Sequence, residues 1–226
     1  MSDTPQVPVS SPNPGLYRPW VLRFIYGPVV IGISHPLVWG VSNRSLRHLH
    51  ASRVGPTHVE VGPGNGHLLA RLPRRTPMQR LELLDLNPAC LHHTQRRLRR
   101  RAFAVHTHQA NALDPWPLAS SSVDSVSAMM VLHTLPGETI AAKALLVREA
   151  ARVLKPGRTL VGCTILARGV SISARAERLM DVYNSKNNTF HNTGDSLGDL
   201  TAVLKQHFPH VTVRTQGCVA VWEATK

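Results

Sequence analysis

A cluster of glycines follows a short apolar stretch in the first third of the chain. The residues run His58-Val-Glu-Val-Gly62-Pro-Gly64-Asn-Gly66, so that three glycines recur at every second position. A loop of this kind can turn tightly and bring its backbone close to a ligand, because no Cβ stands in the way. A helix that begins at Gly66 would add free amides and a dipole that attract negative groups. The cluster therefore predicts a ligand-binding loop between a strand and a helix.

Two common phosphate-binding loops do not match this cluster. A dinucleotide fingerprint needs a third glycine where this chain has His67, and a P-loop needs a Gly-Lys-Ser/Thr run that the cluster lacks. The glycines therefore do not indicate a dinucleotide or a nucleoside triphosphate as the ligand.

Further polar residues stand where predicted strands end. Asp85 closes the run Leu-Glu-Leu-Leu-Asp about twenty residues after the glycines, where an acidic side chain can accept both hydroxyls of a ribose. Asn111 and Ala112 follow a third strand, and the run Met129-Met-Val-Leu-His133 closes a fourth. Asp124, at the start of that fourth strand, is interpreted as structural. In open α/β sheets, ligands bind at the carboxyl ends of the strands, so these residues can meet at one site.

Strands and helices alternate from residue 54 onward. Alternation of this kind predicts an α/β fold with a parallel-rich sheet and helices on both faces. Helical spacing, an early proline at Pro88 and the stop at Lys155-Pro-Gly157 mark the helices. We predict strands over 59–61, 81–86, 102–106, 123–133, 159–166, 211–214 and 218–222, and helices over 66–72, 88–101, 138–154, 175–183 and 197–207.

The segments outside this alternation give the predicted domain organisation. Residues 1–15 hold four prolines and are predicted to form a flexible tail, followed by a single domain over 16–226. Within that domain, 54–166 form the core. Residues 16–50, rich in aromatic and aliphatic side chains, form a helical lid, and 168–195 cover the substrate. A lid of this composition favours an apolar or aromatic ligand.

The ordered set of motifs resembles the class I S-adenosylmethionine-dependent methyltransferases. It comprises the glycine cluster, Asp85, Asn111-Ala112, the run ending at His133, and Arg148-Glu-Ala-Ala-Arg-Val-Leu-Lys-Pro-Gly157. The similarity covers residues 54–166 and implies a Rossmann-like, seven-stranded, mostly parallel sheet. It also implies S-adenosylmethionine as the cofactor and a small molecule as the methyl acceptor.

The resemblance also implies roles for individual residues. Asp85 would bind the ribose hydroxyls, Leu86 would pack on the adenine, and Met129 would lie near the methionine end. Asn111 would accept from the adenine amino group, where the family more often has Asp; Asn keeps an acceptor oxygen but loses the charge. Ala112 would supply a backbone amide. The methionine end would be held by Glu60 and the backbone of Gly62, Gly64 and Gly66.

The implied reaction is an in-line displacement at the methyl carbon of a sulfonium, in which the protein mainly orients the reactants. A hydroxyl acceptor would profit from a general base, because a neutral oxygen is a poor nucleophile. His133 is the first candidate for this base, and His191 and Tyr26 are weaker ones. O-methylation is slightly preferred to N- or C-methylation. We expect no metal site, since the pairs His48/His50 and His106/His108 lack a third ligand.

The charge balance leaves more than one partner open. Lys and Arg number 26 against 13 Asp and Glu, a net charge of +13, which suits nucleic acid, an anionic lipid or an acidic small molecule. The arginine-rich stretch 92–101 is interpreted as a solvated helix face. The motifs of nucleic-acid methyltransferases, Asn/Asp-Pro-Pro-aromatic after the fourth strand and a Pro-Cys nucleophile, do not occur. Nucleic acid is therefore not the expected partner.

Two alternative functions stay open. Residues 24–43 carry no Lys, Arg, Asp or Glu, which would suit a membrane-surface enzyme that methylates a lipid or quinone. A methyltransferase-like protein that binds the cofactor without transferring methyl, as a cyclase or a regulator, would keep the same motifs. The three scattered cysteines and the N-terminus without a signal peptide predict a cytoplasmic protein with reduced thiols.

Overall fold

The structure of the chain is a computed structural model that describes residues 35–185 and 189–226. The predicted tail, most of the predicted lid and Tyr26 lie outside the described residues. The helices are α2 (Asn43–Ser52), α3 (His67–Ala70), α4 (Pro88–Leu98), η2 (Leu132–Thr134), η3 (Ala141–Lys143), α5 (Ala144–Val153), α6 (Ala174–Ser185) and α7 (Leu197–His207). The strands are β1 (Thr57–Val61), β2 (Arg80–Asp85), β3 (Ala104–Gln109), β4 (Val123–Met129), β5 (Leu154–Ile165), β6 (His210–Gln216) and β7 (Val219–Thr225).

All these strands form one sheet in the order β3-β2-β1-β4-β5-β7-β6. Neighbouring strands from β3 to β5 pair in parallel, whereas β7 runs antiparallel to both β5 and β6. The prediction of a seven-stranded, mostly parallel α/β sheet is therefore confirmed. The strand order changes direction between β1 and β4, which is the position where such sheets bind ligands.

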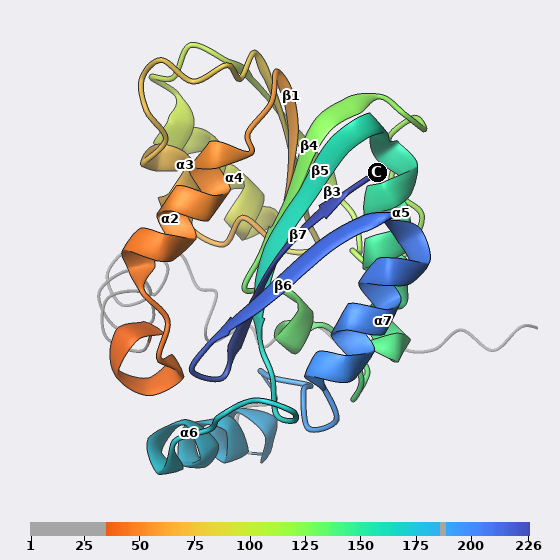
Figure 1. Cartoon of the computed structure of the whole chain (residues 1–226). Helices are drawn as coiled ribbons and strands as arrows, with labels where there is room; N and C mark the ends of the chain where they lie inside the picture. Colours follow the sequence, from red (N-terminus) through yellow and green to blue (C-terminus); the bar gives the residue numbers. More distant parts are fainter. Residues whose placement is uncertain (1–34, 186–188) are drawn as a thin grey trace, which may run out of the picture.

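Helices cover both faces of the sheet (Figure 1). On one side, α2, α3 and α4 bury leucines such as Leu46, Leu69 and Leu91. On the other side, α5 and α7 bury Val147, Leu200 and similar residues in one large apolar cluster. Strand β4 lies between two layers of helices and is buried at every position, as expected for a central strand of a parallel sheet.

Local chemistry explains where α4 begins. The side chain of Asn87 accepts a hydrogen bond from Ala89 N at 2.9 Å, and Pro88 occupies the first turn. The capping side chain accepts from one backbone N–H of the first helical turn, which has no partner within the helix. Proline has no N–H, so its position needs no partner. The helix can therefore begin directly after β2. This cap also brings Asp85, the last residue of β2, next to the start of a helix.

Several predicted boundaries were wrong. The fourth strand was predicted to run to His133, but β4 ends at Met129 because Met130 adopts a positive φ of 60° and the chain turns into η2. The helix predicted over 138–154 is a short 3-10 turn followed by α5. The Lys155-Pro-Gly157 stop belongs to β5, because Gly157 N donates to Lys226 O and keeps the strand paired beyond the helix.

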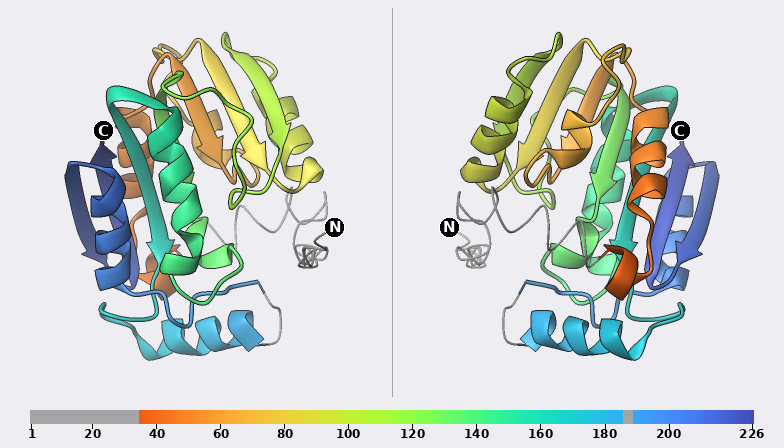
Figure 2. Two further views of the ribbon diagram at one scale, coloured as in Figure 1. Left: turned by 90° about the vertical axis from the view of Figure 1, so that its right-hand side faces the viewer. Right: turned by 90° about the vertical axis from the view of Figure 1, so that its left-hand side faces the viewer.

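The parallel strands all point toward one edge of the sheet, and α6 lies beyond that edge (Figure 2). The chain reaches α6 from the carboxyl end of β5 and returns through residues 189–195 to α7. This arrangement places the predicted substrate-covering segment over the carboxyl ends of the strands, where the site residues were expected.

Candidate active site

The glycine loop between β1 and α3 has the backbone that its sequence predicts. Gly62, Gly64 and Gly66 all have positive φ, at 62°, 55° and 67°, a region that only glycine enters without strain. Gly66 N donates to Pro63 O at 2.8 Å and closes the turn. A Cβ on Gly62 would lie 2.7 Å from Val131 Cγ2. The loop therefore lies directly against the segment that follows β4.

Asp85 ends β2 beside this loop with an incompletely satisfied carboxylate. Its Oδ1 accepts from Asn87 N at 2.8 Å, and no other described residue donates to the side chain. Burial raises the pKa of Asp85 to about 6, because a desolvated carboxylate with one donor is poorly stabilised. A vicinal diol would supply the two missing donors.

Asn111 and Ala112 follow β3 in a tight turn. Asn111 Oδ1 accepts from Leu113 N at 3.0 Å, which fixes the side chain and leaves a second lone pair on that oxygen. The Ala112 amide has no hydrogen-bond partner within the described part of the chain. An acceptor oxygen next to a free amide can pair with the edge of an adenine ring.

Met129 and Leu86 lie at the carboxyl ends of two strands of the sheet. Met129 is the last residue of β4 and is 7% exposed, while Leu86 directly follows β2 and is half-buried. Both strand ends lie at the carboxyl edge. The two apolar side chains can therefore contact a ligand that lies across the ends of β2, β1 and β4.

Glu60 does not lie open at this edge. It is 3% exposed, and its Oε2 receives hydrogen bonds from His50 Nε2 at 2.7 Å and Ser127 Oγ at 2.7 Å, with His58 Nε2 at 3.3 Å. Burial would raise the pKa of Glu60, but the charge and hydrogen bond of His50 and the bond to His58 lower it to about 2. Glu60 thus links α2, β1 and β4 inside the core, a role that the sequence did not indicate.

This group is also the one set of described residues whose side chains converge closely enough to hold a metal ion. The ligand atoms of His50, His58 and Glu60 lie within 4.8 Å of one another. The hydrogen bonds above, together with His58 Nδ1 to Ser125 Oγ at 2.7 Å, account for the arrangement without an ion. His48, the other histidine of the pair His48/His50, lies on the exposed side of α2, whereas His50 is buried.

His133 lies in η2, just after β4, and is 3% exposed. Its Nδ1 lies 3.2 Å from Thr164 Oγ1, which also accepts from His133 N at 3.0 Å. Burial lowers the pKa of the imidazole to about 3, with further lowering by the nearby Lys143 and His35. His133 is therefore a neutral, hydrogen-bonded side chain at the carboxyl edge.

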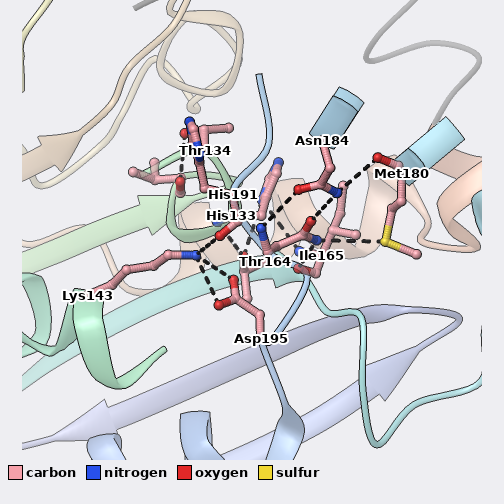
Figure 3. Close-up of polar contacts among 11 residues, drawn as sticks. His133, Thr134, Lys143, Thr164, Ile165, Met180, Asn184, His191 and Asp195 are labelled. Atoms are coloured by element: carbon pink, nitrogen blue, oxygen red, sulfur yellow. Dashed lines mark hydrogen bonds and ion pairs between the residues drawn. The ribbon is translucent and has the colours of Figure 1, made fainter. Parts of the chain in front are cut away.

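His191 lies beside His133 on the returning segment. Its backbone N donates to His133 O at 2.8 Å, and its side chain is half-buried. Burial and then Lys143 lower its pKa. The structure thus brings two of the predicted base candidates together at one edge of the sheet (Figure 3).

A buried ion pair lies under these histidines, and the sequence did not single it out. Lys143 and Asp195 are both 0% exposed, and Nζ lies 2.8 Å from Oδ2 and 3.0 Å from Oδ1 (Figure 3). Lysine is almost never fully buried unless it is paired. A sequence signal for this pair would have been weak, because the two residues lie 52 positions apart.

Aromatic side chains gather next to the histidines. The Phe190 ring lies 4.5 Å from that of His133, 4.8 Å from that of Tyr183 and 5.8 Å from that of Trp39, measured between centroids. These residues come from the turn before α2, from η2, from α6 and from the returning segment. A largely buried cluster of aromatic rings from several parts of the chain therefore packs at the carboxyl edge.

The arginines at the end of α4 and directly after it are mainly solvated or structural. Arg96, Arg99 and Arg100 are exposed. Arg101 donates to the carbonyls of Leu72 and Pro73 at 3.0 and 2.8 Å, just after α3. Much of the positive charge on this helix thus lies outside the carboxyl edge of the sheet.

Comparison with known proteins identifies the family of the chain. Residues 59–157 match the model of a methyltransferase domain. The chain is 39% identical, over 88% of its length and 85% of the relative, to demethylluteothin O-methyltransferase of Streptomyces thioluteus. It is 30% identical, over 93% of both chains, to the physcion biosynthesis cluster O-methyltransferase of Aspergillus chevalieri.

Solved structures show the same fold. An O-methyltransferase family protein from Burkholderia thailandensis superposes with a TM-score of 0.67 at 17% identity, covering 93% of this chain and 63% of that one. The geranyl diphosphate C-methyltransferase of Streptomyces coelicolor, solved with S-adenosyl-L-homocysteine, gives 0.58 at 17% identity over 80% and 76% of the two chains.

Sequence, fold and site together define a Rossmann-like methyltransferase. The chain belongs to the class I S-adenosylmethionine-dependent methyltransferases that act on small molecules. Its cofactor is S-adenosylmethionine, and the residues present fit that group. The cofactor brings an activated methyl group, and the glycine loop, the Asp85 carboxylate and the Ala112 amide are the groups that would hold it.

Proposed function

We propose that this methyltransferase transfers a methyl group to an oxygen of a small apolar or aromatic acceptor. The proposal is carried by the relative of Streptomyces thioluteus, an O-methyltransferase whose similarity extends over 88% of this chain. Such coverage includes α6 and the returning segment as well as the cofactor core. The aromatic group around Phe190 supports an acceptor of this kind, because apolar surface with few polar groups favours apolar ligands.

The cofactor would lie across the carboxyl ends of β2, β1 and β4. In this arrangement Asp85 accepts from the ribose hydroxyls, Leu86 packs on the adenine, and Asn111 and Ala112 pair with its edge. Gly62, Gly64 and Gly66 let the backbone approach the methionine end beside Met129. Glu60 acts indirectly, by fixing β1 to α2 and β4. The acceptor would lie on the side of η2 and residues 189–195, so that the methyl carbon faces its oxygen.

The described residues contain no helix long and apolar enough to cross a bilayer. The hypothesis of a lipid or quinone acceptor rests on the uncharged stretch 24–43, of which the structure describes residues 35–43. It remains one arm of the test below.

The test is a methyl-transfer assay on the purified full chain. The chain is incubated with S-adenosylmethionine and, separately, with demethylluteothin, 4-methylumbelliferone, or vesicles of phosphatidylethanolamine and ubiquinol. Mass spectrometry then identifies the product and the methylated atom. We expect an O-methyl ether of one of the first two compounds. Methylation of the vesicle components alone, or at nitrogen or carbon, would contradict the proposal.

A further inference from the structure

The Lys143–Asp195 pair is a fully satisfied charge pair below the site. Lys143 Nζ donates to both Asp195 oxygens and, at 2.6 Å, to the carbonyl oxygen of His191. An ammonium has three N–H donors, so each has an acceptor here. Lys143 ends η3, and α5 begins at the next residue. The pair therefore ties this segment to the helical layer around α5.

Hydrogen bonds hold both the carbonyl and the N–H of His191 in the returning segment. Its carbonyl accepts from Lys143, and its N–H donates to His133 O at 2.8 Å. The next residue, Asn192, is 0% exposed and bonds both to Ile165 O at 3.1 Å and to Asn184 Oδ1 through its own N–H at 3.3 Å. The His191 side chain thus projects from a rigid backbone, as Figure 3 shows.

The two histidines differ in which nitrogen can accept a proton. Ile165 N donates to His133 Nδ1 at 3.5 Å, and a backbone N–H can only donate, so this nitrogen accepts. The Thr164 hydroxyl, 3.2 Å from the same nitrogen, then also donates to it. His133 Nδ1 is then an acceptor, and the neutral ring carries its proton on Nε2. In this tautomer Nε2 is a hydrogen-bond donor and has no lone pair for an incoming proton.

His191 has no such constraint. Its hydrogen bonds with other described residues involve only its backbone, and its half-buried ring keeps contact with solvent. A neutral imidazole that is reachable from water can accept a proton and release it afterwards.

We propose that the Lys143–Asp195 pair is a positioning element that holds His191 at the acceptor, and that His191, not His133, takes the proton of the acceptor hydroxyl. The inference rests on the proposed O-methylation. The acceptor oxygen forms a bond to the methyl carbon as the bond from carbon to sulfur breaks, and the sulfur keeps that electron pair. The hydroxyl proton passes to an imidazole nitrogen of His191 and then to water. His133 Nε2 donates a hydrogen bond to the acceptor and orients it.

The charges near His191 favour its neutral form. Lys143 is the charged group that lowers its pKa, in addition to burial. A base must be unprotonated at the working pH, so a cation fixed beneath it keeps it ready. The titratable groups on the surrounding elements are Lys143 of η3, His133 of η2, Tyr183 of α6, Asp195 of its own segment, and His35 of the turn before α2.

The positioning claim is tested without any acceptor. NMR of the imidazole nitrogens of the ¹⁵N-labelled full chain, saturated with S-adenosyl-L-homocysteine, reports the tautomer and pKa of each histidine. We expect His133 to stay neutral with its proton on Nε2 from about pH 5 to 8, and His191 to titrate below the usual value near 6.5. An Nδ1–H tautomer of His133, or a His191 pKa at or above the usual value, would overturn the inference.

Variants then separate positioning from folding. The double variant Lys143→Met/Asp195→Leu removes both charges and leaves none buried alone, and the circular dichroism spectrum shows whether it folds. If it folds, we expect the pKa of His191 to rise toward the usual value. If it does not, Lys143→Gln, which keeps a donor for His191 O, replaces it with the same expectation. Lys155→Met is the control, because Lys155 pairs with Asp124 at the opposite edge of the sheet. An unchanged His191 pKa in the folded variant contradicts the role of the pair.

Kinetics test the proton transfer with whichever of demethylluteothin or 4-methylumbelliferone the parent methylates. We expect His191→Phe to lower kcat by at least about 100-fold and to remove the dependence of kcat on the His191 pKa. We expect His133→Gln, which keeps a side-chain N–H, to change mainly KM. A His191→Phe variant with the parent's kcat and pH profile refutes the inference and leaves O-methylation intact. If the parent methylates neither compound, the proposed function fails, while the NMR result still decides the positioning claim.

Discussion

The carboxylate of Glu60 lies 2.7 Å from His50 Nε2, and both residues are at most 3% exposed. The contact joins α2, the first described helix, to the strand that leads into the glycine loop. Ser127 of β4 donates to the same oxygen. The acidic residue of the first motif therefore fixes the helical layer to the sheet next to the cofactor loop.

Removing His50 should destabilise the fold strongly. His50→Leu would leave Glu60 buried without its nearest hydrogen-bond partner, and loss of one partner of a buried pair costs about 3–5 kcal/mol. Urea denaturation measures the change in the free energy of unfolding. The matched control is His48→Leu on the exposed side of α2, which we expect to stay within about 0.5 kcal/mol of the parent. Equal effects at the two positions would show that the buried contact contributes nothing specific.

The same contact predicts a pH dependence of stability. The folded pKa of Glu60 is about 2, below the ordinary value of 4.5, so the unfolded chain binds this proton more readily. The contribution of Glu60 is therefore fully present above about pH 4.5 and is lost as the pH falls toward 2. Urea midpoints of the parent and of Glu60→Gln measure it: the difference between them should shrink across this window. A difference that stays constant would contradict the depressed pKa.

The Asp85 carboxylate should contribute to the affinity for the cofactor. Calorimetry should show that Asp85→Ala weakens S-adenosylmethionine binding about 10- to 100-fold, since hydrogen bonds to a charged group contribute about 1.5–3 kcal/mol. Undiminished affinity would remove Asp85 from the cofactor site.

In the absence of the cofactor, replacing Asp85 should raise the stability of the fold. Because burial raises the pKa of Asp85 to about 6, its ionised form is less stable in the folded chain, and Asp85→Asn should raise the melting temperature near neutral pH. The gain should fade as the pH falls through about 6 toward 3.8, where the parent itself becomes protonated. A lower melting temperature for Asp85→Asn would contradict this account.

Gly62→Ala should damage the loop for two separable reasons. The substitution requires a positive φ and brings Cβ to 2.7 Å from Val131 Cγ2, so we expect a loss of about 2–4 kcal/mol in unfolding free energy. Gly157→Ala is the control, because Gly157 has φ 74° and a Cβ there would meet nothing within 4 Å, so it should lose only about 1 kcal/mol. Val131→Ala added to Gly62→Ala should recover the steric part alone. Equal losses at the two glycines would show that the close approach has no cost.

Local sequence patterns determined the class of fold and the cofactor. The alternation of strands and helices, the glycines spaced by two and the acidic end of β2 depend only on neighbours in the chain, and each kept its predicted place. The limits of β4 and α5 were missed because the positive φ of Met130 and the pairing of Gly157 with Lys226 depend on contacts outside the local pattern.

Tertiary structure decided which polar side chains are buried together. Glu60 meets Ser127, and Lys143 meets Asp195, across 67 and 52 residues of sequence. From sequence alone, a lysine or a carboxylate is expected at the surface, since burial of a charge is costly unless a partner is present. Only the assembled sheet and the returning segment supply that partner, and they also set the environments that distinguish His133 from His191.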